Sequence, residues 1–304
     1  MTRKSEKQPS ASWENVAEWY LGWSGRNGSA YHRRIAIPAV MHLLDVRPGQ
    51  TILDVGCGPG ALASHVIRAS ATYVGVDSSF SMIEAATRYH RHRRARFVHA
   101  NAAGLCAALP HTGNRFDSVV CLLSIQDMDP IDRIVDEMAH TLRPGGRLVV
   151  FMTHPCFRIP RQSGWGWDAR RKLKYRRVDR YLTPLAVPME PYKRGNGHTK
   201  SYHRPLSVYV RAMATAGLTI DAMEEIPVDQ KVIDRRRDGD TAMLSKEIPV
   251  FLCVRAVKAG RNPDEHDGTF RAFDVEIGQG VSTNEKASER EKRREARFQK
   301  GEKS

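Results

Sequence analysis

The stretch that decides the fold is Thr51–Gly60, which reads TILDVGCGPG. Its first half combines β-branched and apolar residues, which predicts a short buried strand. Its three alternating glycines then permit a tight turn into a helix and let a ligand lie against bare backbone. The dinucleotide-binding fingerprint fits loosely, with Ala61 in place of its third glycine, but Asp54 argues against it. A pyrophosphate at a helix N-terminus needs N–H groups and no adjacent carboxylate, whereas a ligand with an ammonium and a sulfonium would suit Asp54.

A second acidic residue supports the same kind of ligand. Thr72–Val76 is another apolar run that predicts a strand, and Asp77 closes it 21 positions after Gly56. A carboxylate at that place can accept hydrogen bonds from both hydroxyls of a ribose. The pattern D-x-G-x-G-x-G followed by a strand-ending acid resembles the class I S-adenosylmethionine (SAM)-dependent methyltransferases, and within them the UbiE-like, type-11 group.

The resemblance extends beyond the glycine loop. FDSVV at Phe116–Val120 and LRPGGRL at Leu142–Leu148 are similar to that group's fourth strand and to the turn into its fifth, and the resemblance covers about Val46–Val257. It implies an α/β fold with a doubly wound, seven-stranded, mostly parallel sheet of the Rossmann-like type. Leu218–Ile226 and Val250–Val257 would form its antiparallel pair. A nicotinamide-binding domain is the main competing interpretation.

The resemblance also implies a set of SAM-binding residues. Asp54 would order the glycine loop and the methionine ammonium, the glycines would admit the methionine portion, and Asp77 would hold the ribose. Phe80 or Met82 would pack on the adenine. Asn101 stands where the family often has an Asp, and its side-chain oxygen can accept the same hydrogen bond, although a turn cap is the alternative. The full set is Asp54, Gly56, Gly58, Gly60, Asp77, Ser78, Met82 and Asn101.

Catalysis needs few further groups. Methyl transfer is an in-line displacement on an activated donor, so alignment can supply ~7–11 kcal/mol of barrier reduction. A base is needed only if the acceptor must lose a proton. Four side chains near the expected cleft are candidates: Gln126 and Asp127 after the fourth strand, His154 after the fifth, and His203 before the helix expected at Pro205–Ala216. For each histidine, a bond to loop backbone is the alternative.

Composition bounds the class of protein. The chain has 304 residues and a formal charge of +14. Its N-terminus is polar and lacks an apolar h-region, so no secretory signal is expected. No apolar run approaches the ~18 residues needed to span a bilayer. The five cysteines lack C-x-x-C spacing, which predicts neither a zinc site nor a disulfide framework and favours a cytoplasmic protein.

The segment Arg158–His203 interrupts the alternation of strands and helices after the fifth strand. It shows no clear periodicity, and Arg158–Arg204 holds 13 Lys and Arg against three acidic residues, a balance of +10. Aromatics lie among these cations, as in surfaces that stack bases and neutralise phosphates, but also as in the lid of a small-molecule pocket. We favour an insert that selects a small anionic or aromatic methyl acceptor. An RNA methyltransferase of the tRNA type is the alternative, although no RNA-binding module and no DNA-binding motif accompanies the insert.

The remaining segments complete the expected organisation. Residues 1–12 read as a disordered leader, 13–258 as the methyltransferase domain including the insert, and 259–304 as a polar charged tail. Trp13, Trp19 and Trp23 are expected to pack against the domain, with Tyr20 and Tyr31 as weaker candidates for a lid. A nicotinamide-dependent oxidoreductase and a non-catalytic SAM-fold partner protein are the less favoured functions.

Overall fold

The computed structural model describes residues 13–109, 116–189, 198–228 and 247–260. All described residues belong to one compact unit, called the first unit below. The leader expected over 1–12 lies outside the described residues, as does the charged tail apart from its first two residues.

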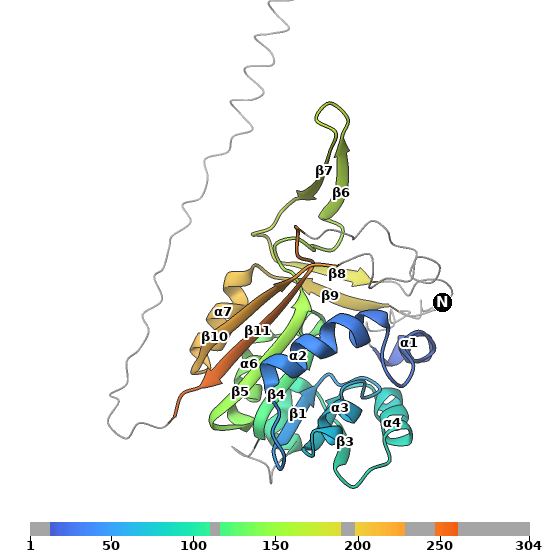
Figure 1. The fold of residues 1–304 in the computed structure, drawn as a ribbon, viewed down its shortest axis with the longest axis vertical. Helices are drawn as coiled ribbons and strands as arrows, with labels where there is room; N and C mark the ends of the chain where they lie inside the picture. Colours follow the sequence, from blue (N-terminus) through green and yellow to red (C-terminus); the bar gives the residue numbers. More distant parts are fainter. Residues whose placement is uncertain (1–12, 110–115, 190–197, 229–246, 261–304) are drawn as a thin grey trace, which may run out of the picture. The chain divides into compact units, whose positions relative to one another are not determined.

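The first unit is built on one seven-stranded sheet with the order β10-β11-β5-β4-β1-β2-β3 (Figure 1). Neighbours from β5 to β3 pair in parallel, whereas β11 pairs antiparallel with both β5 and β10. The doubly wound, mostly parallel fold is therefore confirmed. The strands are β1 (Thr51–Val55), β2 (Thr72–Asp77), β3 (Ala95–His99), β4 (Phe116–Leu122), β5 (Leu142–Thr153), β10 (Leu218–Ile226) and β11 (Phe251–Lys258).

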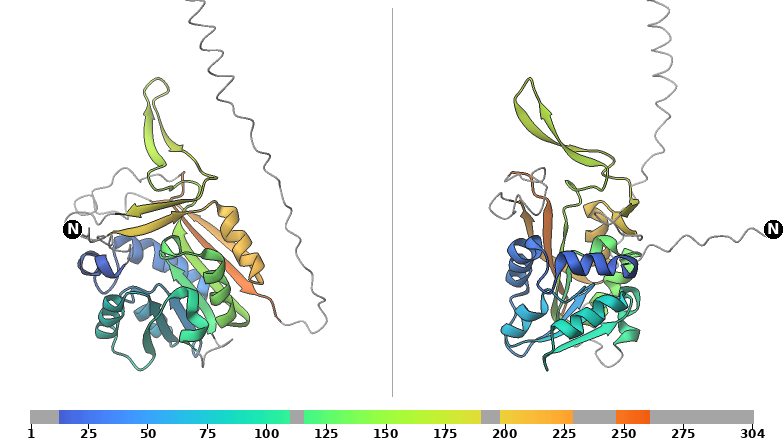
Figure 2. Two further views of the ribbon diagram at one scale, coloured as in Figure 1. Left: turned by 180° about the vertical axis from the view of Figure 1, so that it is seen from behind. Right: turned by 90° about the vertical axis from the view of Figure 1, so that its right-hand side faces the viewer.

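Helices cover both faces of the sheet (Figure 2). The helices are α1 (Ala17–Ser24), α2 (Ile37–Leu44), α3 (Ala63–Arg68), α4 (Phe80–Tyr89), α5 (Leu105–Ala108), α6 (Ile131–Thr141) and α7 (Leu206–Thr215). Successive strand residues point to opposite faces, so Leu53 and Val55 of β1 join the core under α5, α6 and α7, while Ile52 joins the core under α2 and α3. Burial on both faces explains why the strands read as continuous apolar runs.

The insert after β5 is more regular than its sequence indicates. It forms two antiparallel hairpins, one of β6 (Ser163–Asp168) and β7 (Leu173–Val178), the other of β8 (Leu185–Met189) and β9 (Thr199–His203). The lack of clear periodicity in the sequence of 158–203 therefore does not mean a lack of regular structure. β6–β7 is a separate ribbon (Figure 1), and β9 packs against the 3₁₀ turn Ile125–Asp127 that follows β4.

Within the described residues, no helix is long and apolar enough to cross a membrane.

Candidate functional site

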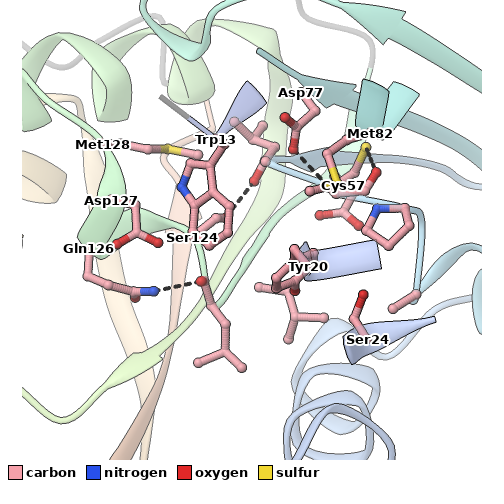
Figure 3. Close-up of a pocket in the computed structure, with 18 of the residues that line it drawn as sticks. Trp13, Tyr20, Ser24, Cys57, Asp77, Met82, Ser124, Gln126, Asp127 and Met128 are labelled. Carbon is pink, nitrogen blue, oxygen red and sulfur yellow. Dashed lines mark hydrogen bonds between the residues drawn. The ribbon is translucent and has the colours of Figure 1, made fainter. Parts of the chain in front are cut away.

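A cavity of about 470 Å³ lies at the carboxyl ends of β1, β2 and β4 (Figure 3). Its walls come mainly from residues within 54–62, 76–78 and 122–129, and from the N-terminal segment 13–32. Parallel sheets bind ligands at this edge, and the volume is that of an ordinary small-molecule site.

The glycine loop after β1 is shaped by close packing. Gly56 has φ of +71°, and a Cβ there would lie 2.6 Å from the Ser124 hydroxyl, so only glycine fits. Gly58 has φ of +53° and faces the cavity. Gly60 is not among the lining residues, because it packs on the other side: a Cβ would lie 2.9 Å from the His90 ring. Two of the three glycines therefore line the cavity, and the third lets the loop pack against the end of α4.

Asp54 is a buried carboxyl with an unfilled hydrogen-bonding position. Its side chain is only 1% exposed, and Oδ2 accepts a hydrogen bond of 2.7 Å from the Tyr73 hydroxyl. Oδ1 has no partner among the described residues. Burial raises the pKa of Asp54 to about 7, although the Tyr73 hydrogen bond opposes the rise. A nearby cation would stabilise the ionised form, so this wall of the cavity favours a positively charged ligand.

Asp77 joins the glycine loop to the start of α4. Its Oδ2 accepts the Gly58 N–H at 2.8 Å and its Oδ1 accepts the Ser79 N–H at 2.9 Å. Burial raises the pKa of this carboxyl, and the two N–H bonds oppose the rise. Each carboxylate oxygen can accept a second hydrogen bond, so the side chain is fixed and still able to receive two hydroxyls.

The residues expected around the adenine are only partly gathered at the cavity. Ser78, Met82 and Asn101 line it, and Met82 is buried. Phe80 is 61% exposed and packs edge-on against the His99 ring, so Met82 is the better candidate of the two. Asn101 Oδ1 already accepts the Ala103 N–H at 2.9 Å as a turn cap, which leaves one lone pair for a ligand.

The N-terminal aromatics form a wall of the cavity, a place that the expectation of packing against the domain did not include. Trp13, Trp19, Tyr20 and Trp23 all line the cavity and contact one another. Trp19 and Trp23 stack with centroids 6.1 Å apart. This cluster, Trp13–Trp23, is called the aromatic wall below.

One carboxylate ties the aromatic wall to α4. Glu14 accepts hydrogen bonds from the hydroxyls of Ser79 and Ser81, each at 2.5 Å, and from the Ser81 N–H at 3.2 Å. These bonds lower the pKa of Glu14, with the Ser79 hydroxyl as the largest cause. A negative charge at the start of a helix is also favoured by the helix dipole. The wall is thus anchored beside Asp77.

The four catalytic candidates separate into two pairs. Gln126 and Asp127 line the cavity, on the 3₁₀ turn after β4. Burial raises the pKa of Asp127 to about 7, and hydrogen bonds from Ser201 and Gln126 oppose the rise. Gln126 Nε2 donates to the Leu123 carbonyl at 2.6 Å, while its buried Oε1 has no partner among the described residues. This pair offers acceptors for a ligand's N–H or O–H.

The two histidines do not reach the cavity walls, and we correct our expectation for both. His154 is 1% exposed; its Nδ1 accepts the Cys156 N–H at 3.2 Å, and its Nε2 lies 2.9 Å from Glu225 Oε1. His203 Nε2 donates to the Tyr181 carbonyl at 2.7 Å. Burial lowers the pKa of each. His154 holds the turn after β5 and contacts β10, whereas His203 holds two parts of the insert together. Each imidazole thus bonds loop backbone, which is the alternative that the sequence left open.

Comparisons with known proteins agree with this geometry. Residues 52–146 match the family model described as "Methyltransferase domain". The S-adenosylmethionine-dependent methyltransferase of Mesorhizobium loti has a solved structure that aligns with a TM-score of 0.61 and 26% identity, over 77% of this chain and 100% of that one. Residues 52–146 thus form a methyltransferase domain, and the fold is that of the class I SAM-dependent methyltransferases.

The curated relatives align with different fractions of this chain. Demethylmenaquinone methyltransferase from Tropheryma whipplei (strain Twist) is 33% identical over 118 residues, covering 38% of this chain and 48% of the relative. N-demethylindolmycin N-methyltransferase from Streptomyces griseus is 27% identical over 221 residues, 71% of this chain and 90% of the relative. The chain spans only about half the length of several relatives that it matches, the first among them.

The residues that line the cavity fit SAM. The unpartnered Asp54 oxygen suits a cation, the bare backbone at Gly56 and Gly58 leaves room beside it, and Asp77 keeps two acceptor positions. The lining carries the carboxylates of Asp54, Asp77, Asp127 and Asp129 against one Arg, Arg158. The described part of the chain has no cluster of three or more His, Cys, Asp or Glu able to hold a metal ion.

Proposed function

We propose that this protein transfers the methyl group of SAM to a small-molecule acceptor. The observation that carries the proposal is the arrangement of Asp54, the glycine loop and Asp77 around one cavity. SAM supplies a methyl group already activated by a sulfonium. The protein's part is therefore to bind, align and exclude water, which is where most of the rate enhancement of such a displacement arises.

The proposed cofactor contacts follow from the polar groups of the cavity. Asp54 would stabilise the positive charge of the methionine portion, and Gly56 and Gly58 would let that portion lie against backbone. Asp77 would accept the ribose hydroxyls. Ser78, Met82 and Asn101 would surround the adenine, with Met82 as the apolar surface.

We favour an aromatic acceptor over an anionic one. The +10 balance of 158–204 suggested an anion, but four carboxylates and one Arg line the cavity. The aromatic wall offers faces on which a ring can stack, and this kind of contact is worth about 0.5–1.5 kcal/mol per pair beyond area burial. Relatives named as demethylmenaquinone and N-demethylindolmycin methyltransferases add support for a small molecule. We also propose the cytoplasm as the compartment, since all five cysteines are free thiols.

Calorimetry tests the cofactor half of the proposal. We expect SAM and its demethylated product to bind the wild type, NAD not to bind, and Asp77→Ala to lose most of the affinity. An Asp136→Ala variant, which removes an exposed carboxylate outside the cavity, is the matched control. No SAM binding, or unchanged binding in Asp77→Ala, would contradict the proposal.

Radiolabelled methyl transfer into fractionated cell extract tests the acceptor half. Label in the low-molecular-weight fraction supports a small acceptor, whereas label that RNase removes would establish the RNA alternative. Binding without label in any fraction would indicate a non-catalytic partner protein.

The RNA alternative has one observation in its favour. The β6–β7 ribbon exposes Trp167 at 62%, and Lys174 lies 4.3 Å from the ring centroid of Trp165. RNA binding through such cations would fall steeply with salt, with a log–log slope of about −0.7 per phosphate contacted on a single strand.

A further inference from the structure

Strand β9 of the insert and Arg204, which follows it, make two contacts with the segment after β4 that lines the cavity. Strand β9 packs against the turn Ile125–Asp127, and the Ser201 side chain of β9 hydrogen-bonds Asp127. Just after β9, Arg204 Nη2 donates to the Met128 carbonyl and to Asp129 Oδ1, both at 2.7 Å. The insert therefore holds the segment that carries Asp127 at two successive points.

Arg204 is well placed to fix this segment. It is 6% exposed, and its guanidinium lies over the Tyr202 ring at 4.9 Å from the centroid. Met128 and Asp129 line the cavity, but Arg204 does not. Because the guanidinium is buried while Asp129 is half exposed, opening these contacts would leave the buried charge of Arg204 without its partners, and this cost holds the side chain in place. Arg204 can thus act on a ligand only through the residues it holds.

Asp127 is the group in this segment whose charge changes near neutral pH. The groups that face it are Tyr20 of α1, Cys121 of β4 and Tyr209 of α7, with Arg204 beside Tyr209. Burial raises the pKa of Tyr20 and Tyr209 above their ordinary values and that of Cys121 to about 12. These neighbours therefore keep their protons where Asp127, with a pKa of about 7, gains and loses one.

We propose that the acceptor is an aromatic compound that presents an N–H or O–H to Asp127, which takes its proton, and that Arg204 is the positioning residue that holds Asp127 in place. This inference rests on the proposed function and names the substrate class of that site. In the step, a lone pair on the acceptor nitrogen or oxygen forms the bond to the methyl carbon as the carbon–sulfur bond breaks. Sulfur keeps the electron pair, and the acceptor's proton passes to the Asp127 carboxylate.

Two further groups of the cavity agree with a ligand that donates hydrogen bonds. The buried Gln126 Oε1 is an acceptor without a partner in the described part of the chain, and its amide orientation is set by the Nε2 bond to Leu123. The Ser24 hydroxyl, on the aromatic wall's helix, is likewise unpartnered there. A methyl acceptor that has no N–H or O–H would leave the buried Gln126 Oε1 without a hydrogen bond. This cost would make the site bind such a compound more weakly.

The first experiment measures the proton affinity of Asp127 without SAM. We expect carboxyl ¹³C NMR, with the signal assigned by its loss in Asp127→Asn, to titrate near pH 7. Ser201→Ala removes a hydrogen bond to the ionised form, so the pKa should rise by about one unit. A carboxyl that titrates below pH 5, or that does not respond to Ser201→Ala, overturns the assignment.

The second experiment measures ligand preference in protein saturated with the demethylated product. Phenol and aniline serve as probes, with anisole, N,N-dimethylaniline and benzoate as matched comparisons, and aromatic proton shifts report binding. We expect phenol and aniline to bind about tenfold more tightly than their methylated counterparts and than benzoate. Equal binding of a pair, or preference for benzoate, overturns the proposed substrate class.

The third experiment tests Arg204 as a positioning residue. Arg204→Gln should weaken phenol binding about tenfold while the SAM Kd stays within about twofold, and Arg204→Lys should recover part of the loss. Arg255→Gln, which breaks the 2.9 Å ion pair with Asp221 away from the cavity, is the matched control and should change neither affinity. If Arg204→Lys folds and binds phenol no better than Arg204→Gln, or if neither variant differs from the wild type, Arg204 has no positioning role. Absence of SAM binding in the wild type would instead refute the proposed function itself.

Discussion

Replacing Asp54 by Asn should make the cofactor-free protein more stable at pH 8. The folded protein holds the pKa of this carboxyl at about 7, against an ordinary value of 3.8. Since the folded state keeps its proton longer than the unfolded state, this group's stability contribution falls as pH rises from about 4 to 7. The difference of about three units corresponds to roughly 4 kcal/mol at pH 8. In the variant, the buried Asn Nδ2 has no hydrogen-bond acceptor, which costs ~1–3 kcal/mol. The net increase in the free energy of unfolding at pH 8 is therefore about 1–3 kcal/mol.

Urea unfolding of wild type and Asp54→Asn at pH 5 and pH 8 measures this gain. At pH 5 the wild-type carboxyl is largely protonated in the folded state, so the advantage of the variant should shrink by about 3 kcal/mol relative to pH 8. The same variant should bind SAM much more weakly. In the wild type, the Asp54 contribution should make SAM affinity rise about tenfold per pH unit up to about pH 7 and then level off. Asp127→Asn keeps this contribution and is the control.

Two results would refute the reasoning. One is a folded Asp54→Asn protein that is less stable than the wild type at pH 8, because the buried charge would then carry no cost. The other is SAM affinity equal to that of the wild type, because the unpartnered oxygen would then have no part in holding a cation.

Three further predictions follow from the contacts described. Replacing residues 164–177 by Gly-Gly should leave the SAM Kd within about twofold in calorimetry, because none of them lines the cavity, and loss of binding by a folded variant would contradict this. Glu14→Gln should weaken SAM binding. Because hydrogen bonds, that from Ser79 first, lower the pKa of Glu14, the higher SAM affinity of the wild type should persist above pH 4.5 and be lost as the pH falls further. His154→Gln should lower the Tm, since the contact with Glu225 is lost, while the pH profile of methyl transfer stays the same; a shifted profile would return His154 to the catalytic candidates.

The sheet could be predicted because its signals are local. Thr51–Val55 and Thr72–Asp77 are short apolar runs with an acid at or near the end, and burial on both faces imposes that composition. The hairpins of the insert could not be predicted, because apolar and polar residues alternate little along their strands. β6 reads SGWGWD, and its glycines carry no side chain on one face, where the Tyr175 ring of β7 lies over Gly166. Pairing between its own two strands, more than burial, gives this ribbon its structure.

The site was predictable where motif spacing fixes position. Asp54 and Asp77 lie at the carboxyl ends of β1 and β2, and Gly56 and Gly58 directly follow β1. Parallel strands bring these ends to one edge of the sheet. His154, which follows β5, and His203, at the end of the insert, were expected at the cavity on the same argument, which fails once the chain leaves the sheet. Whether a side chain after the last parallel strand turns inward depends on hairpin register and on partners such as Glu225, distant in sequence.

The acid-rich lining has a consequence for the end of the catalytic cycle. Asp54, Asp77, Asp127 and Asp129 surround a cavity whose cofactor arrives with a positive sulfur and leaves with a neutral one. The electrostatic attraction between these carboxylates and the cofactor therefore becomes weaker once the methyl group has been transferred. Asp127 also becomes neutral in the same step if it receives the proton of the methyl acceptor. The change in charge thus favours release of the demethylated product and binding of a new SAM molecule. The difference in affinity between SAM and this product should become smaller as the pH falls and the carboxylates are protonated.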